Sequence, residues 1–217
     1  MYGYECKKKL KQGNCQDKRC LYPEVCQGLK PNHSNLINLM KELRRINGVK
    51  HIFTASGIRY DLIFADKETG IEYLKKVAGH HVSGQLKIAP EHTENNILSL
   101  MGMPQNNLLL EFKKRFDAFS KRTGKNQFLT YYFIAAHPGC RESDMKNLKK
   151  FIRKYLKINP EQVQVFTPTP STYSSLMYYT GLNPFTGEKI FVEKSSKGRE
   201  KQKQIITEKN KYKSQIK

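Results

Sequence analysis

Apolar side chains recur every third or fourth residue in several stretches of the chain, as they do on the buried face of an amphipathic helix. In the first stretch these positions are Leu36, Leu39, Met40 and Leu43, and Ser34 is placed to cap the helix. Thr93 caps the third stretch, and acidic residues open the fifth, where the helix dipole favours them. The pattern predicts helices at 33–46, 67–81, 93–102, 106–124 and 142–158.

Four shorter stretches are rich in β-branched and aromatic residues and predict strands, at 47–56, 82–90, 127–136 and 161–168. Strands that alternate with helices of this length indicate parallel βαβ units, and therefore an α/β fold. The sequence shows no internal repeat. Residues 193–217 are too polar to bury a face, so we expect a frayed helix or a tail there.

Each predicted strand runs into polar, Pro- or Gly-bearing sequence: "SGIRYD", "KIAPEH", "AAHPG" and "TPTPST" in chain order. In parallel α/β folds, ligands bind where the carboxyl ends of the strands meet the loops that follow them. One such end alone would be a tight turn with a capping residue. Four in succession predict that the ends converge on one face and form a shared site.

Four of the five cysteines, Cys6, Cys15, Cys20 and Cys26, lie close to the N-terminus, and the fifth is Cys140. The odd count and the lack of a secretory signal in "MYGYECKKKL" predict a reducing, cytoplasmic location, where disulfides are rare. Four thiolates suit zinc or an auxiliary iron–sulfur cluster equally well, and we hypothesise a metal site here. The alternative is four unligated thiols, some of them buried as small apolar groups.

The chain carries 39 Lys and Arg against 19 Asp and Glu, a net charge of +20, and the excess is concentrated in residues 1–30 and 193–217. Such a surface attracts nucleic acid or anionic substrates, although a lysine-rich solvated surface would look the same. No stretch approaches the roughly 18 apolar residues of a membrane span, so no membrane partner is expected.

The strand ends resemble the second half of a radical S-adenosylmethionine (SAM) barrel. "LKIAPEHTENNILSLMGMP" resembles the strand that carries a glutamate and runs into a helix, and "YYFIAAHPGCRESDM" resembles the next strand with its Pro-Gly ending. "VQVFTPTPSTYSSLMYYTG" resembles the sixth strand, with Ser171 where that pattern has glycine. Over residues 1–197 the chain is similar to the YgiQ-type radical SAM proteins.

This resemblance implies a Cys-rich loop segment at 1–32, a partial radical-SAM-type parallel (β/α) barrel at 33–192 and a basic tail at 193–217. It also implies SAM and a [4Fe–4S] cluster as cofactors of the full-length family, with the cluster held by Cys-x3-Cys-x2-Cys. That triplet is missing from this sequence, which looks like a fragment that begins inside the barrel. We therefore expect a chain that is not catalytic alone, with the N-terminal half of the barrel as its partner if that half is encoded separately.

By the same resemblance, the SAM-binding residues are Ser56, Arg59, Glu91, His137 and Gly139. Glu91 would accept hydrogen bonds from the ribose or the amino group of SAM, or instead cap the next helix. Arg59 would clamp a carboxylate, or instead pair with Asp61. The backbone from 133 to 139 would pack against adenine.

His92 and His137 are candidate proton carriers, although a histidine beside a turn is more often structural. Two other interpretations remain for the whole chain. It can be a basic four-cysteine metal-binding module that binds RNA or DNA through its ends, or an inactive product of an interrupted gene. An incomplete barrel would expose a strand edge near Val49, which predicts self-association or marginal stability.

Overall fold

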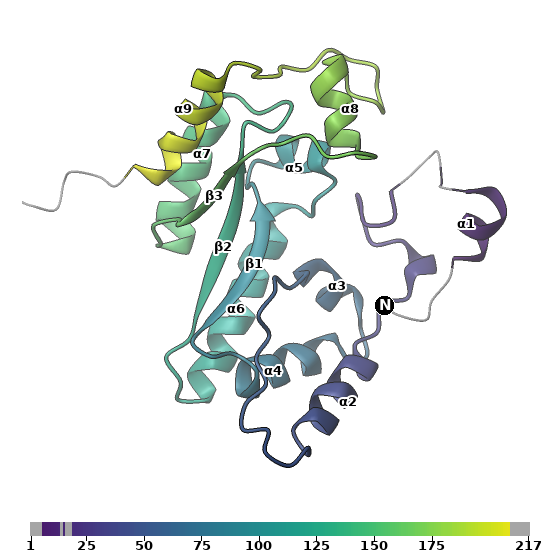
Figure 1. The fold of residues 1–217 in the computed structure, drawn as a ribbon, viewed down its shortest axis with the longest axis vertical. Helices are drawn as coiled ribbons and strands as arrows, with labels where there is room; N and C mark the ends of the chain where they lie inside the picture. The colour runs from purple at the N-terminus through teal and green to yellow at the C-terminus, as the bar shows by residue number, and fades with distance from the viewer. Residues whose placement is uncertain (1–5, 14, 16–18, 209–217) are drawn as a thin grey trace, which may run out of the picture. The chain divides into compact units, whose positions relative to one another are not determined.

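The computed structural model describes residues 6–13, 15 and 19–208. The chain folds as two units, each considered by itself below. Unit 1 comprises residues 1–89 and 102–130, and unit 2 comprises residues 90–101 and 131–217. Figure 1 shows the elements of both units.

Three strands form one sheet in the order β1-β2-β3 (Figure 1). They are β1 (Gln85–Glu91), β2 (Phe128–Ala135) and β3 (Gln162–Val165). Alternate side chains of β1 and β2 are buried, as the period of two in a pleated strand requires. β2 pairs with β3 in parallel, with Phe133 opposite Val163. The predicted α/β fold with parallel strands is therefore confirmed, with three strands in place of four.

Unit 1 is built from short helices around the first parts of β1 and β2. The helices are α1 (Lys7–Gln12), the 3-10 turn η1 (Gln27–Leu29), α2 (Ser34–Leu43), α3 (Tyr60–Ala65), α4 (Gly70–His80) and α6 (Asn106–Arg122). α3, α4 and α6 pack against one another. Phe112 and Phe116 of α6 are fully buried, with the rings of Tyr60 and Phe64 against Phe112. This aromatic cluster is the centre of the unit 1 core.

Unit 2 contains β3 and the later helices. They are α5 (Asn95–Met101), α7 (Glu142–Phe151), the π-helical turn η2 (Ile152–Leu156), α8 (Tyr173–Thr180) and α9 (Ser196–Thr207). α9 packs against both α7 and β3, as Figure 1 also shows. The core of the unit includes Phe133, Met145, Leu148 and Met177, all completely buried.

The first predicted strand, at 47–56, is wrong. This segment contains no strand, and Phe53 is 47% exposed there. The chain meets the sheet only at Ile58, which forms an isolated parallel bridge with Ile88 and donates its N–H to the Lys87 carbonyl (3.2 Å). A segment rich in β-branched and aromatic residues forms a strand only where neighbouring strands satisfy its backbone and bury one face.

Three other differences concern helices. α3 was not predicted, because the polar letters of "SGIRYD" look like a loop although Tyr60 and Asp61 are buried. Ser34 is the first residue of α2 and not its cap, and its N–H donates to the Asn32 side chain (2.8 Å). α9 lies in the segment predicted to be too polar to pack, yet it buries Gln202 and Ile206. A helix needs only one narrow apolar stripe to pack, and average polarity conceals such a stripe.

Candidate functional site

The residues that follow the three strands have an unusual backbone in common. The chain turns through a left-handed, non-glycine residue at Glu91 (φ 63°), Ala136 (φ 58°) and Ser171 (φ 60°), each at or beyond the end of a different strand. This conformation costs a residue with a Cβ about 1–2 kcal/mol. Such residues persist where the surrounding structure fixes them, and they gather at binding and catalytic sites. The strand ends are therefore the first place to look for a site.

Two strand ends meet in unit 2 through a buried chain of hydrogen bonds. His92, just after β1, accepts the Glu94 N–H at Nδ1 (3.0 Å), so its proton is on Nε2. His92 Nε2 lies 3.7 Å from Sγ of Cys140, in the loop after β2. The Cys140 thiol in turn donates to the Arg141 carbonyl (3.7 Å). The predicted convergence of the ends is thus seen for β1 and β2.

His137 connects the segment after β3 to the loop after β2. Its Nδ1 lies 2.8 Å from the Pro138 carbonyl, which can only accept, so Nδ1 carries the proton. Nε2 then accepts from the hydroxyl of Ser174 at 2.8 Å, and the ring makes an edge contact with Phe166. Phe166 and Ser174 both follow β3. Three of the four predicted polar ends therefore lie together in unit 2.

Burial keeps these groups uncharged. It lowers the pKa of His92 to about 3, with a smaller contribution from His137, and it lowers the pKa of His137 to about 4. Burial likewise raises the pKa of the Cys140 thiol to about 12, with the charge of Asp144 adding to it. At neutral pH the pair of His92 and Cys140 is imidazole and thiol, so it is not an activated cysteine nucleophile.

The other predicted residues of unit 2 have defined surroundings. Glu91 is half-buried, and its charge, second to burial, raises the pKa of Tyr132. Gly139 donates its N–H to the Phe191 carbonyl (2.7 Å) at φ 91°. A Cβ on Gly139 would lie 2.3 Å from a methyl carbon of Leu100. The absence of a side chain at Gly139 therefore allows α5 to pack closely against the loop after β2.

Ser56 and Arg59 belong to unit 1. Ser56 is exposed. Arg59 is paired with Asp61, the second of its two predicted roles: Nε donates to Oδ1 at 2.8 Å and a terminal nitrogen contacts Oδ2. The Asp61 side chain is 5% exposed and that of Arg59 is 41% exposed. A carboxylate this deeply buried holds the guanidinium in one orientation.

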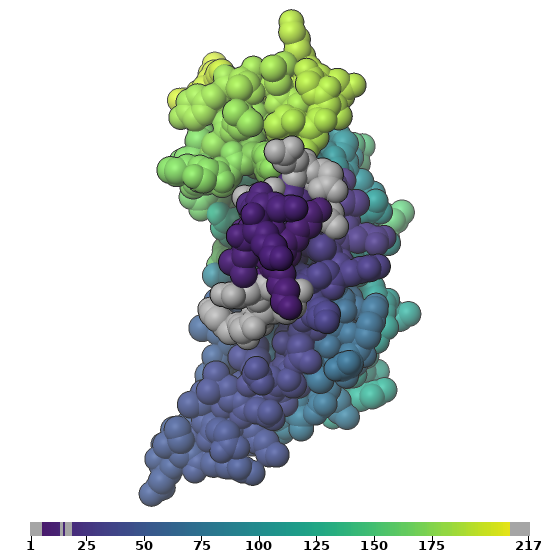
Figure 2. Space-filling view, turned by 90° about the vertical axis from the view of Figure 1, so that its right-hand side faces the viewer, coloured from purple at the N-terminus to yellow at the C-terminus, as the bar shows by residue number. Residues whose placement is uncertain are grey.

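All four N-terminal cysteines lie among the described residues, and all are free thiols. The N–H of Cys26 donates to the Cys20 carbonyl (2.8 Å), which brings two of these backbones together. Within residues 6–13, 15 and 19–208, no three His, Cys, Asp or Glu side chains are placed to hold a metal ion. α1 has no buried residue and belongs to the dark purple patch that faces the viewer in Figure 2. The metal site stays a prediction.

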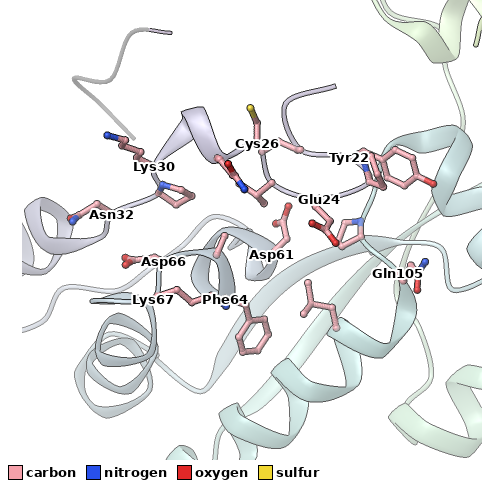
Figure 3. A pocket seen from close by; sticks show the side chains of 18 of the residues that line it. Tyr22, Glu24, Cys26, Lys30, Asn32, Asp61, Phe64, Asp66, Lys67 and Gln105 are labelled. Carbon is pink, nitrogen blue, oxygen red and sulfur yellow. The ribbon is translucent and has the colours of Figure 1, made fainter. Parts of the chain in front are cut away.

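A large open cavity of about 1180 Å³ lies in unit 1, between the segment 21–32, α3 and the start of α6 (Figure 3). Its lining has charges of both signs, from Glu24, Asp61, Glu68, Lys30 and Lys67. Cys26 borders it with its sulfur directed away from α3.

One edge of this cavity is fixed by Asp66, whose side chain is 1% exposed. Its carboxylate accepts from the N–H of His33 (2.8 Å), the N–H of Thr69 (2.9 Å) and the hydroxyl of Thr69 (2.6 Å). Burial alone would raise the pKa of Asp66, but the hydrogen bonds from Thr69 and His33 outweigh it and hold the pKa well below its usual range. Asp66 thus ties the start of α2 to the loop between α3 and α4.

Two participants in the unit 2 site were not predicted. Ser174 holds His137, and Gln202 of α9 accepts the Ala136 N–H (3.1 Å) and donates to the Cys140 carbonyl (3.1 Å). Ser174 lies 37 residues from its partner and Gln202 lies 66 and 62 residues from its two. Nothing in the sequence marks these two residues, since one is an ordinary serine and the other is a glutamine in a polar helix.

Among the described residues, no helix combines the length and apolar character needed to cross a membrane. Residues 161–213 match the family DUF3362, a domain of unknown function.

The whole chain is similar to several proteins named UPF0313. It is 57% identical over 211 residues to one from Fusobacterium nucleatum, covering 97% of this chain and 37% of that protein. It is 46% identical to one from Methanosarcina acetivorans, covering 95% of this chain and 27% of that protein. It is 45% identical to one from Thermotoga maritima, covering 97% of this chain and 37% of that protein. The chain spans about a third of the length of these relatives. It is therefore a homologue of the UPF0313 proteins that corresponds to one part of them.

Proposed function

We propose that this chain is the part of a YgiQ-type UPF0313 protein that forms the second half of a radical SAM barrel. In this proposal its strand ends contribute to binding SAM. The observation that carries it is the left-handed, non-glycine backbone at the ends of β1 and β2, at Glu91 and Ala136, and again at Ser171 in the loop that follows β3. Backbone held in a costly conformation at the ends of neighbouring strands favours a binding site there.

The residues of this chain fit SAM better than they fit a cluster. Glu91 places a half-buried carboxylate beside Tyr132, at the end of β1, where it can accept from a diol or an ammonium group. SAM, when bound, supplies a sulfonium group whose reductive cleavage initiates radical chemistry. By contrast, the described residues contain no group of three cluster ligands, and the sequence has no Cys-x3-Cys-x2-Cys. We assign the [4Fe–4S] cluster to the part of the UPF0313 relatives that lies outside this chain.

His92 and His137 act in this proposal as positioning residues. Both ring nitrogens of each histidine lie within hydrogen-bonding distance of other groups of unit 2, and both pKa values lie well below neutrality. A proton carrier needs a pKa near the working pH and a free route to its partner. The two imidazoles instead fix the loops after β1 and β2, which present Glu91 and the backbone at Ala136.

Equilibrium dialysis of the full chain against SAM tests the proposal. The wild-type chain should bind SAM saturably, and Glu91→Gln should weaken binding on the order of tenfold, through the loss of a charge-assisted hydrogen bond. Glu94→Gln, three residues away, is the matched control and should leave binding unchanged. Wild-type chain that binds no SAM, or a Glu94→Gln variant as impaired as Glu91→Gln, would contradict the proposal.

A further inference from the structure

The helical segment formed by α7 and η2 has two contrasting faces. Met145, Leu148, Ile152 and Leu156 are buried in the core of unit 2. Their spacing of three or four residues defines one side of the helix. The opposite side is exposed to solvent.

Basic residues dominate that exposed side, although Asn147 and Tyr155 are exposed as well. Lys146, Lys150, Lys154 and Lys157 are all exposed and follow one another at the same helical spacing. We call these four residues the α7 stripe. Residues 145–160 contain no Asp or Glu, and none of the four lysines forms an ion pair with another residue that the structure describes. At a rise of 1.5 Å per residue the stripe is about 16 Å long.

The stripe also presents an aromatic ring. Tyr155 is 42% exposed, with Nζ of Lys154 5.0 Å from the centre of its ring. The ring of Phe151 packs against that of Tyr155, with 4.8 Å between the two ring centres, and so restricts its movement. An exposed ring beside Lys154 offers a stacking surface next to positive charge.

A small cavity of about 60 Å³ lies beside the stripe. Lys149, Arg153 and Asn159 line it with hydrogen-bond donors, together with Glu208 at its border. Ammonium, guanidinium and amide groups are the donors that recognise phosphate oxygens.

We propose that the α7 stripe binds a single-stranded nucleic acid, with its lysines on successive phosphates and Tyr155 stacked on a base. Charge complementarity selects a polyanion, because a line of unpaired cations without an acid repels other basic surfaces and gains most from a phosphate backbone. The exposed ring favours a single strand, since the bases of a duplex are already stacked. This surface is distinct from the strand ends.

Fluorescence anisotropy with a labelled twelve-nucleotide oligouridine, over about 50–200 mM KCl, tests the proposal on the full chain. The triple variant Lys150→Gln, Lys154→Gln and Lys157→Gln should bind on the order of 100-fold more weakly at about 100 mM salt. The slope of log affinity against log salt should fall by about 2, since each lost phosphate contact in a single strand removes about 0.7. Tyr155→Ala should weaken binding on the order of tenfold and Tyr155→Phe should not, because stacking requires only the ring.

The matched control removes the same charge from the exposed side of α6, with Lys114→Gln, Lys121→Gln and Arg122→Gln. It should change affinity less than threefold. All six positions are exposed, and circular dichroism checks that both triple variants keep their helices. Three results would overturn the proposal: no binding by the wild type at about 50 mM KCl, equal losses in both triple variants, or tighter binding of a duplex of the same length.

Discussion

Acidification from about pH 7.5 to about pH 5 should destabilise unit 2 through His92 and His137. Burial lowers the pKa of these side chains from 6.5 to about 3 and about 4, so neither binds a proton at pH 5 while the chain is folded. In the unfolded chain both recover a pKa near 6.5 and are protonated at that pH. The unfolded state then binds more protons than the folded state, and the free energy of unfolding falls as the pH falls.

The magnitude follows from the distance between pH 5 and the unfolded pKa, about 1.5 units. At about 1.4 kcal/mol per unit, each histidine contributes a loss of about 2 kcal/mol, or about 4 kcal/mol for the pair. The loss begins near pH 6.5 and continues down to the folded pKa values. Stopping at pH 5 keeps most of the effect of carboxylate protonation, which includes that of Asp66, out of the measurement.

Urea unfolding followed by circular dichroism at the two pH values measures this difference. His92→Asn retains an acceptor for the Glu94 N–H, and His137→Gln retains one for Ser174, but neither variant titrates. Each should reduce the pH-dependent loss by about 2 kcal/mol, whereas His51→Gln, at an exposed histidine, should not. A wild type equally stable at both pH values, or a loss that survives in both buried-site variants, would refute the assignment of neutral buried imidazoles.

Three further predictions concern thiols and a buried carboxylate. In metal-free native chain, a thiol reagent should modify the exposed Cys20 quickly and Cys140 only after unfolding, since burial raises the pKa of Cys140 to about 12; rapid native labelling of Cys140, read by mass spectrometry, would contradict this. Asp66→Asn should lower the free energy of unfolding by about 2–3 kcal/mol, because a buried site loses a charge-assisted acceptor, whereas the exposed Glu42→Gln should cost less than about 0.5 kcal/mol in the same urea titration. Metal analysis of anaerobically purified protein should find zinc or iron near stoichiometric amounts if the N-terminal cysteines bind a metal, and its absence would end that hypothesis.

The long, strongly periodic elements could be predicted from the sequence almost to the residue. α6 was expected at 106–124 and β2 at 127–136, because both have a regular apolar spacing that one neighbouring surface satisfies. The strand predicted at 47–56 was wrong for the opposite reason, because a strand depends on neighbouring strands that its own sequence does not specify. α3 was missed because its six residues are too few to show the apolar spacing of a helix.

The candidate site was predictable only in part, for a similar physical reason. Chain order placed Glu91, His92 and His137 at strand ends, and parallel strands bring such ends to one edge. The partners of the histidines are set by tertiary contacts over long separations, as between His92 and Cys140, 48 residues apart. Whether an imidazole is neutral depends on how deeply it is buried, and the letters around it do not determine that.

The amide of Gln202 has a consequence for where this chain can be divided. Through one side chain, α9 satisfies the backbone on both sides of the turn after β2. A cut before residue 161, where the DUF3362 match begins, would take away the side chain that pairs with the Ala136 N–H and the Cys140 carbonyl. Dividing the chain where that match begins would therefore remove two hydrogen bonds from the turn after β2, and in the folded chain the parts on either side of residue 161 depend on each other.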